Sequence, residues 1–195
     1  MKYNLTQNGF SLVETLVAIS ILLIVITGPM AISATTARSV SFSSEQVTAF
    51  FLAQEGAEIA QKARDDLLLE NFPADLADVW DYFVNDSGGD YDECFTGNGC
   101  GLELNTDSTG SLKAPVSCSG TNCKLYYDDS AFTRASYTHT EGANETTVYT
   151  RVIKFEVTEP DREVRIESKV TWRTGSQRAE QEVVVETYLF NVYGS

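Results

Sequence analysis

The stretch "NGFSLVETLVAISILLIVITGPM" (residues 8–30) decides how this chain is organised. From Phe10 to Ile26 the residues are apolar except for Glu14 and small hydroxyl residues. Extended through Ile32, the run has about 20 residues, which as a helix cross the roughly 30 Å hydrocarbon layer of a bilayer. An ionisable group at that depth costs a few kcal/mol, so Glu14 is a candidate functional residue.

Length and charge limit what the rest of the chain can be. The 195 residues suffice for one modest domain and a long helix. The 28 acidic and 14 basic residues give a net charge of −14, and the bases are scattered. Binding to nucleic acid needs clustered Lys and Arg, so no direct contact with nucleic acid is expected.

A cleavable secretory signal is the first alternative for the N-terminal segment. "AISATTA" (31–37) offers small residues for cleavage, and the chain would then be an ordinary secreted globular protein. Against this, Lys2 is the only base before the span, and Glu14 interrupts the apolar region that such a signal needs.

The residues "GFSLVE" (9–14) resemble the class III signal of type IV prepilins and type II secretion pseudopilins. The resemblance implies a leader over residues 1–9, cleavage between Gly9 and Phe10 by a prepilin peptidase, and N-methylation of Phe10. It implies a single-pass protein of the cytoplasmic (inner) membrane with its C-terminal head outside the cytoplasm. The expected partners are the peptidase, the lipid bilayer, the membrane assembly platform, and other pilin or pseudopilin subunits contacted through the N-terminal helix.

The spacing between Phe10 and Glu14 has a physical reading. Cleavage creates an α-amine on Phe10, with an ordinary pKa near 8. Glu14 lies about one helical turn away, so the two charges have nearly the same depth. A buried charge is tolerated when it is paired, either within one chain or between staggered neighbours. Pairing of Glu14 with such an amine would then favour assembly in the correct register. The alternative is that the Glu14 carboxylate snorkels to the membrane surface and has no role in assembly.

Gly28 and Pro29 lie within the later part of the span. Pro removes a helical hydrogen bond and clashes with the preceding turn, so a kink is predicted here. Either the kink is static or the segment extends in an assembled filament.

Residues 33–70 are expected to continue the helix in amphipathic form, ending near Glu70–Asn71 ahead of Pro73. A stripe at three- and four-residue steps is predicted to face the core, formed by Val47, Phe50 or Phe51, Gln54, Ala57 and Ala60. "FFLAQEGAEIAQKARDD" (50–66) resembles the helix after the membrane span in the minor pilin and minor pseudopilin I class. This resemblance implies an accessory subunit.

Four cysteines lie in the turn-rich region 71–147, at Cys94, Cys100, Cys118 and Cys123. Their even number and Gly/Asn/Ser-rich surroundings favour disulfides over a zinc site or free thiols. We expect two hairpin-like loops closed by Cys94–Cys100 and Cys118–Cys123, although three connectivities are possible. Because the loops are short, such bridges should rigidify loops more than hold the fold.

A calcium site is a weak possibility in "NDSGGDYDE" (85–93). Its candidate ligands would be Asp86, Asp90, Asp92 and Glu93, but the stretch lacks the twelve-residue calcium-loop pattern. A solvated acidic loop is the better interpretation. The only histidine is His139, so no histidine-based metal site or triad is possible, and no cofactor is expected.

The last residues, 148–195, alternate as strands do. Residues 148–157, 164–172 and 180–193 predict an antiparallel meander. In the first strand the inward residues are predicted to be Tyr149, Ile153, Phe155 and Val157, with Arg151 interrupting that face as at a sheet edge. In the second they are Val164, Ile166, Val170 and Trp172. For the third strand either register is possible.

These elements predict an α+β, type IV pilin-like fold. It has a long kinked helix, of which residues 10–32 form the membrane and assembly part, packed on the C-terminal sheet beside a disulfide-bearing loop region. No enzyme motif is found. The expected function is that of a minor pilin or pseudopilin, incorporated in a type IV pilus or a type II secretion-like pseudopilus as an assembly, priming or tip subunit. The alternative is a membrane-anchored adhesion module that uses the disulfide loops.

Overall fold

The computed structural model describes residues 9, 11–72, 76–105, 110–120, 122–129, 136–142, 144–173 and 179–192. The chain divides into two compact units, Met1–Ser44 and Glu45–Ser195, which are described separately. Phe10 and the leader residues 1–8 lie outside the described residues, as does most of the predicted turn at 173–178.

The first unit consists of the N-terminal part of α1 (Leu12–Asn71). Its side chains from Ser11 to Ser41 are exposed. In the described part of the chain, α1 is the one helix whose length and composition suit a membrane crossing. The helix continues through Gly28 and Pro29 without interruption, and the kink there stays a prediction.

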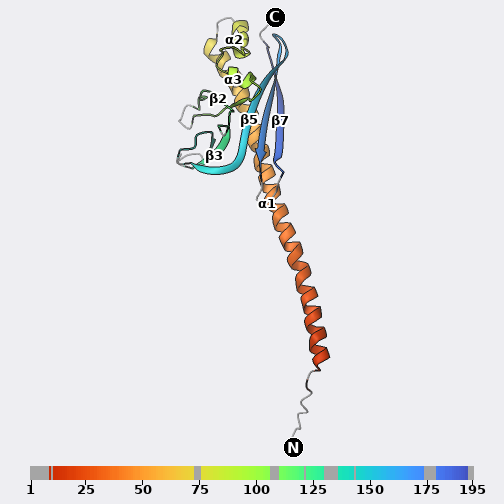
Figure 1. Cartoon of the computed structure of the whole chain (residues 1–195). Coiled ribbons are helices and arrows are strands. Elements are labelled where there is room, and N and C mark those ends of the chain that lie inside the picture. Colours follow the sequence, from red (N-terminus) through yellow and green to blue (C-terminus); the bar gives the residue numbers. More distant parts are fainter. Residues whose placement is uncertain are drawn as a thin grey trace, which may run out of the picture. The chain divides into compact units, whose positions relative to one another are not determined.

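The second unit, called the head below, joins the C-terminal part of α1 to two short helices and a seven-stranded antiparallel sheet (Figure 1). Its other elements are α2 (Leu76–Phe83), α3 (Asp92–Phe95), β1 (Cys100–Gly101), β2 (Val116–Ser117), β3 (Lys124–Asp128), β4 (Ser136–Thr138), β5 (Glu145–Glu159), β6 (Glu163–Trp172) and β7 (Gln181–Phe190). The predicted pilin-like α+β fold is thus confirmed, including the end of α1 at Asn71.

The sheet is organised around β5, its longest strand. On one side β5 pairs with β6, which pairs with β7, and these three strands are the predicted meander. On the other side β5 pairs with β1 and β3, which are followed outward by β2 and β4. The sequence predicts a loop-rich region over 71–147 with two hairpin-like loops, and the structure adds α2, α3 and the strands β1 to β4 there. Segments of two to eight residues are too short to give a clear period.

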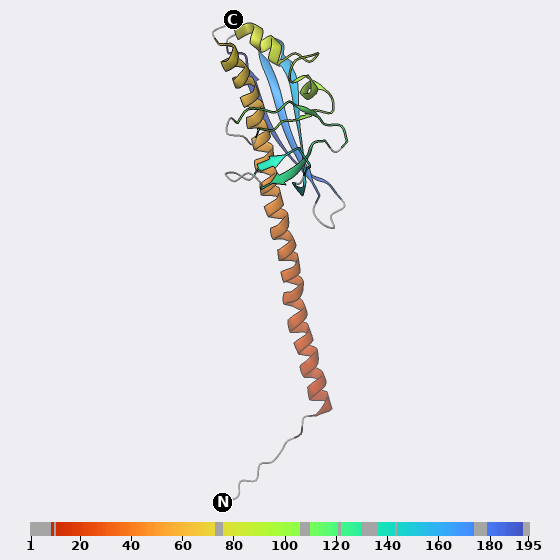
Figure 2. The same ribbon diagram turned by 90° about the vertical axis from the view of Figure 1, so that its left-hand side faces the viewer.

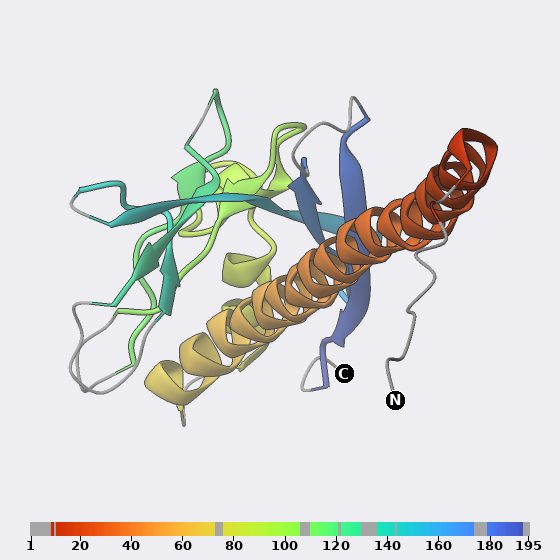
Figure 3. The ribbon, with the colours of Figure 1, turned by 90° about the horizontal axis from the view of Figure 1, so that it is seen from below.

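The head part of α1 lies along one face of the sheet (Figures 2 and 3). The predicted stripe was wrong at Val47, Phe50, Phe51 and Gln54, which are exposed, and right at Ala57 and Ala60. Small residues dominate the buried face of this helix, which consists of Ala49, Leu52, Ala53, Gly56, Ala57, Ile59, Ala60, Ala63 and Leu67. Side-chain size therefore decides which face packs, because small residues let the helix approach the sheet closely.

Gly56 marks the closest approach between this helix and the sheet. A Cβ atom added there would lie 2.4 Å from Ser168 Oγ and 3.0 Å from Arg151 Cδ. Both Ser168 and Arg151 are fully buried, so neither has open space to move into.

The inner face of the meander agrees with most of the sequence prediction. The four residues predicted to face inward in the second strand are all buried, as are Tyr149, Ile153 and Phe155 in the first. Val157 is a correction, because it is 39% exposed. In β7 the open choice of register is settled by buried Leu189, with Val183 and Val185 half-buried on the same face.

Arg151 is a second correction. It does not lie at a sheet edge, because its strand has a neighbour on both sides: its residue partner in β6 is Val170, and its own N–H donates to Cys123 O at 3.0 Å. The side chain is fully buried, beneath α1.

Candidate functional site

The first candidate site is the N-terminal end of α1. Gly9 is exposed, and Glu14 lies in the first turn of the helix. Phe10, the predicted new N-terminus, lies outside the described residues.

Glu14 differs from the other polar side chains of this apolar segment. The hydroxyls of Thr15, Ser20 and Thr27 donate to carbonyl oxygens one turn back in the helix, at 2.9, 2.8 and 3.3 Å. Such bonds satisfy the hydroxyl donor in an apolar environment, because the helix itself supplies the acceptor. Within the described residues, the Glu14 carboxylate has neither a hydrogen-bond nor an ion-pair partner. Among the described polar side chains of residues 12–32, Glu14 is the one without a partner.

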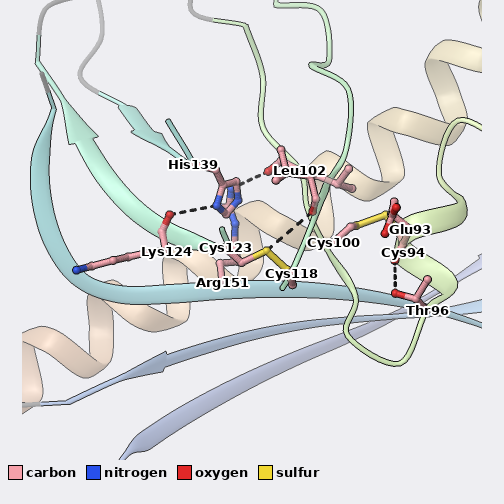
Figure 4. Close-up of a disulfide and its surroundings, with 11 residues drawn as sticks. Glu93, Cys94, Thr96, Cys100, Leu102, Cys118, Cys123, Lys124, His139 and Arg151 are labelled. Atoms are coloured by element: carbon pink, nitrogen blue, oxygen red, sulfur yellow. Dashed lines mark hydrogen bonds between the residues drawn. A yellow bond between two sulfur atoms is a disulfide. The ribbon is translucent and has the colours of Figure 1, made fainter. Parts of the chain in front are cut away.

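The four predicted cysteines form two disulfides, Cys94–Cys100 and Cys118–Cys123 (Figure 4). The Cys118 N–H donates to Gly99 O at 3.0 Å, so the two bridged loops adjoin each other.

The surroundings of the bridges differ from the expected hairpins. Cys94–Cys100 joins α3 to β1, and Cys118–Cys123 joins β2 to β3, which are not neighbours in the sheet. Cys94 and Cys100 are fully buried and belong to the main core cluster. This bridge is therefore part of the packed core, and it does more than rigidify a surface loop.

The weak calcium candidates do not converge. Asp86 accepts a hydrogen bond from Ser87 Oγ in the turn after α2, whereas Asp92 and Glu93 occupy the first turn of α3. Asp90 is hydrogen-bonded to the Tyr82 hydroxyl, and this bond raises the pKa of Tyr82. Over the part of the chain that the structure describes, no group of three or more His, Cys, Asp or Glu side chains could hold a metal ion.

A buried polar cluster lies between α1 and the sheet. The Arg151 guanidinium donates to Glu55 Oε2 at 2.7 Å and to Leu52 O at 3.2 Å, both on α1. It also donates to Leu102 O at 2.9 Å, on the chain that leaves β1. The charge of Arg151 is thus paired and hydrogen-bonded, as a buried charge requires. The cluster fixes α1, β5 and the segment after β1 to one another.

His139 lies beside Arg151 (Figure 4). Its Nδ1 is 3.3 Å from Lys124 O and its Nε2 is buried without a partner among the described residues. Burial, followed by the positive charge of Arg151, lowers the pKa of His139 to about 4. His139 is therefore neutral at ordinary pH, with its proton assigned to Nδ1, which faces the carbonyl.

Glu103 completes this cluster from the segment after β1. Burial by itself raises its pKa, but hydrogen bonds from Lys113, Thr138 and the His139 N–H outweigh burial and lower the pKa overall. Lys113 Nζ lies 2.7 Å from Glu103 Oε1. Each buried charge of the cluster thus has an opposite charge in contact, which indicates a structural role.

No sequence motif predicts this cluster. The available signal was Arg151 itself, an arginine on the apolar face of an otherwise alternating strand. An arginine that is buried at such a position needs an acidic partner, and Glu55 on the facing helix supplies it.

A small pocket of about 210 Å³ is lined by residues of α3, β5 and β6 and by Thr96. Phe95 and Phe155 contribute its apolar lining, and its charged lining includes Arg165 and Glu156. Arg165 and Glu156 form an ion pair with each other, and Lys154 and Glu167 add one charge of each sign. The lining therefore has no net charge that would attract an ionic ligand.

A family model described as the prokaryotic N-terminal methylation motif matches residues 4–28. Neither the comparison with curated proteins nor that with solved structures yields a match. The matched region includes Gly9, Phe10 and Glu14. The chain is thus prepilin-like at its N-terminus. The motif implies processing by a prepilin peptidase, anchoring in the inner membrane before assembly, and assembly with pilin subunits, which are structural proteins and typically not enzymes.

Proposed function

We propose that this chain is a minor pilin or pseudopilin, of the class called minor pilin or minor pseudopilin I. In this proposal the precursor is cut between Gly9 and Phe10, N-methylated on Phe10, and incorporated in a type IV pilus or a type II secretion-like pseudopilus. There it acts as an assembly, priming or tip subunit. The observation that carries the proposal is the unpartnered Glu14 carboxylate, in a segment whose hydroxyl groups are all bonded within the helix.

The missing partner of Glu14 is the α-amine that cleavage creates on Phe10. That amine is positive below its pKa near 8, also when it is methylated. A carboxylate and an amine at the same depth stabilise each other most where water is excluded. A neighbouring subunit that offers its amine to Glu14 would therefore be held in one axial register.

Mass spectrometry of the mature N-terminus tests the processing step. The proposal expects a chain that begins with N-methyl-Phe10. A mature chain that begins near Ala34–Arg38 would instead establish a secretory signal and overturn the proposal.

Glu14→Val tests the assembly step, with Thr15→Val as the matched control. Glu14→Val should insert in the membrane and be cleaved normally, yet fail to enter filaments, because its amine-pairing group is lost. Thr15→Val should enter filaments normally, because the Thr15 hydroxyl is bonded within its own helix. Equal incorporation of both variants, measured in sheared filaments, would refute the pairing role.

Gly28 and Pro29 enter the proposal as the place where the helix can open in the filament. Pro29 lacks the N–H that would continue the ladder, so local extension costs less here than elsewhere in α1. Pro29→Ala should leave membrane insertion unchanged and reduce incorporation, as measured in the same shearing assay. Full incorporation would favour a static kink.

Surface binding by the disulfide loops is a second candidate function for a tip subunit. The observation that favours it is the contact between Cys118 and Gly99, which joins both loops in one surface. Exposed Ser119 and Asn122 lie in the second loop. Replacing both by Ala should leave filament assembly unchanged and lower adhesion of intact filaments, and unchanged adhesion would reject this candidate.

A further inference from the structure

The two edges of the sheet are built differently. On the side of β5 away from β6, the outermost strands are β2 and β4, with only two and three residues. The other edge is β7, whose ten residues pair with β6 from Glu163↔Phe190 to Trp172↔Gln181 without a register shift. Figure 1 shows β7 as the outermost strand on its side.

The orientation of the free backbone groups follows from the pairing. In an antiparallel sheet, successive residues direct their N–H and C=O groups to opposite sides. The Arg151 N–H donates to Cys123 O, so Arg151 points away from β6 and its neighbours Thr150 and Val152 point toward β6. The same alternation can be followed from β5 to β6 and from β6 to β7 with the residue pairs of these strands. It shows that the backbone groups of Val183, Val185, Thr187 and Leu189 bond to β6.

The remaining residues of β7 direct their N–H and C=O groups outward, and these are Glu182, Val184, Glu186, Tyr188 and Phe190. Within the described residues, no other strand pairs with this edge. Proteins usually protect such an edge with Lys, Pro, a bulge or a very short strand. The sequence QEVVVETYLF of β7 contains neither Lys nor Pro, and its register has no bulge.

The side chains of the same five residues form the exposed face of β7. Val184, Tyr188 and Phe190 are 42, 46 and 50% exposed. The charged positions, Glu182 and Glu186, are both acidic; Glu186 Oε1 already accepts a hydrogen bond from Arg165 of β6 at 2.9 Å, whereas no described side chain pairs with Glu182. An incoming strand would thus meet three apolar positions and two acidic ones, and it would match them with apolar and basic side chains.

A second copy of this chain is a poor occupant of the edge. Pairing of two β7 strands, in either direction, would bring a second Glu182 and a second Glu186 to an edge that already carries both acids. Like charges that face each other across paired strands destabilise a sheet.

We infer that the β7 edge is a docking site for an extended segment of a different protein. Where this segment pairs with Glu182–Phe190, its side chains on the exposed face are apolar and basic. The segment adds an eighth strand to the sheet. Its backbone supplies the affinity, and its side chains supply the selectivity. This inference extends the proposed function by naming the chemistry of a partner.

A synthetic peptide tests this docking site directly. The capped, fluorescently labelled peptide VTVTKTVTK places Val opposite Phe190, Tyr188 and Val184 and Lys opposite the two glutamates when it pairs antiparallel. We expect saturable binding to the full chain in nonionic detergent micelles, with a Kd of roughly 0.1 mM as measured by fluorescence anisotropy. The peptide with N-methylated Val and Lys amides should not bind, because those amides donate to the edge, and the peptide with Glu in place of Lys should bind more weakly.

Two variants of one residue separate backbone pairing from side-chain contact. Tyr188→Pro removes an outward N–H without touching a bond to β6, and it should weaken binding about tenfold or more. Tyr188→Thr keeps the N–H and should weaken binding less than about threefold. Circular dichroism checks that both variants are folded.

Three results would overturn the inference: no saturable binding up to about 1 mM, equal binding of the N-methylated peptide, or equal losses in the two Tyr188 variants. Equal binding of the Glu-containing peptide would overturn the basic character of the partner. None of these results touches cleavage or filament entry, so a failure here is distinct from a failure of the proposed function.

Discussion

The two parts of α1, residues 12–44 and 45–71, have the same helical backbone conformation. They differ in which side chains are buried. Large side chains such as Leu22 and Ile24 stay exposed in the first part, whereas the second part buries one face made mainly of small residues. Within the first part, residues 15–32 are apolar around the whole helix except for small hydroxyl residues, which suits lipid or a bundle of helices. In the second part the contact with the sheet depends on how closely the helix can approach.

The largest effect on stability is expected on the buried face of the head part of α1, compared with its exposed face. Leu52→Ala should lower the free energy of unfolding of the head by about 3 kcal/mol, because Leu52 is only 4% exposed and its removal leaves a cavity. Phe51→Ala, at a neighbouring residue that is 62% exposed, should change it by less than about 0.5 kcal/mol. Thermal unfolding in detergent, followed by near-ultraviolet circular dichroism, measures both. Equal effects would show that the helix packs through a different face.

Two glycines compare the two parts of the helix directly. Gly56→Ala should destabilise the head by about 2 kcal/mol, because the new Cβ meets buried Ser168 and Arg151 atoms. Gly28→Ala has no atom within 4 Å of the new Cβ, and it should not destabilise the helix, because Ala favours helix. A Gly56→Ala head as stable as the unchanged chain would show that the contact can relax.

The ion pair between Glu55 and Arg151 occurs in the head part of α1 and has no counterpart among the described residues of the membrane part. Glu55→Gln should cost about 1.5 kcal/mol of head stability, since it leaves the buried Arg151 charge without its anion; the solvent exposure of Glu55 limits the loss. The double variant Glu55→Gln, Arg151→Met should recover part of that loss, because the buried charge is gone. Urea unfolding measures each value, and a double variant less stable than Glu55→Gln would contradict a charge-based cost.

The smallest effect is a pH dependence confined to the head. The pKa of His139 is lowered from 6.5 to about 4 on folding, so between these values the unfolded chain binds more protons. The contribution of His139 to stability is complete above pH 6.5 and is lost as the pH falls toward 4. Between pH 7 and pH 5.5 the loss should be about 1 kcal/mol.

His139→Asn provides the control for this pH dependence. Asn keeps a donor for Lys124 O but does not titrate, so its head should lose less stability over the same pH interval. Identical pH profiles for the two proteins would assign the dependence to other groups.

Much of this architecture could be predicted from the sequence, because its signals are long or periodic. The apolar run after Glu14, the end of α1 at Asn71 and the alternation in β6 each extend over many residues. The processing motif could also be recognised, because its residues are fixed in spacing from Gly9 to Glu14.

The errors have a common physical cause. Hydrophobicity predicts a helix stripe through Phe50 or Phe51, but the sheet packs against Ala53 and Gly56, because closeness of packing decides the contact. The sequence predicts Arg151 at a sheet edge because its partner Glu55 is distant in sequence, and only the fold brings the two together. Strands as short as β1 and β2 exist through pairing with distant residues, which a local pattern does not contain.

The hydrogen bonds between α1 and β5 have a mechanical consequence. The Tyr149 hydroxyl donates to Glu45 O, and two residues later Arg151 donates to Leu52 O and Glu55. These bonds advance along both elements in the same direction. Tension applied along the helix therefore loads them together in shear, instead of breaking them one by one as in peeling. A subunit built in this way can transmit a pull from its helix to its sheet before the two separate.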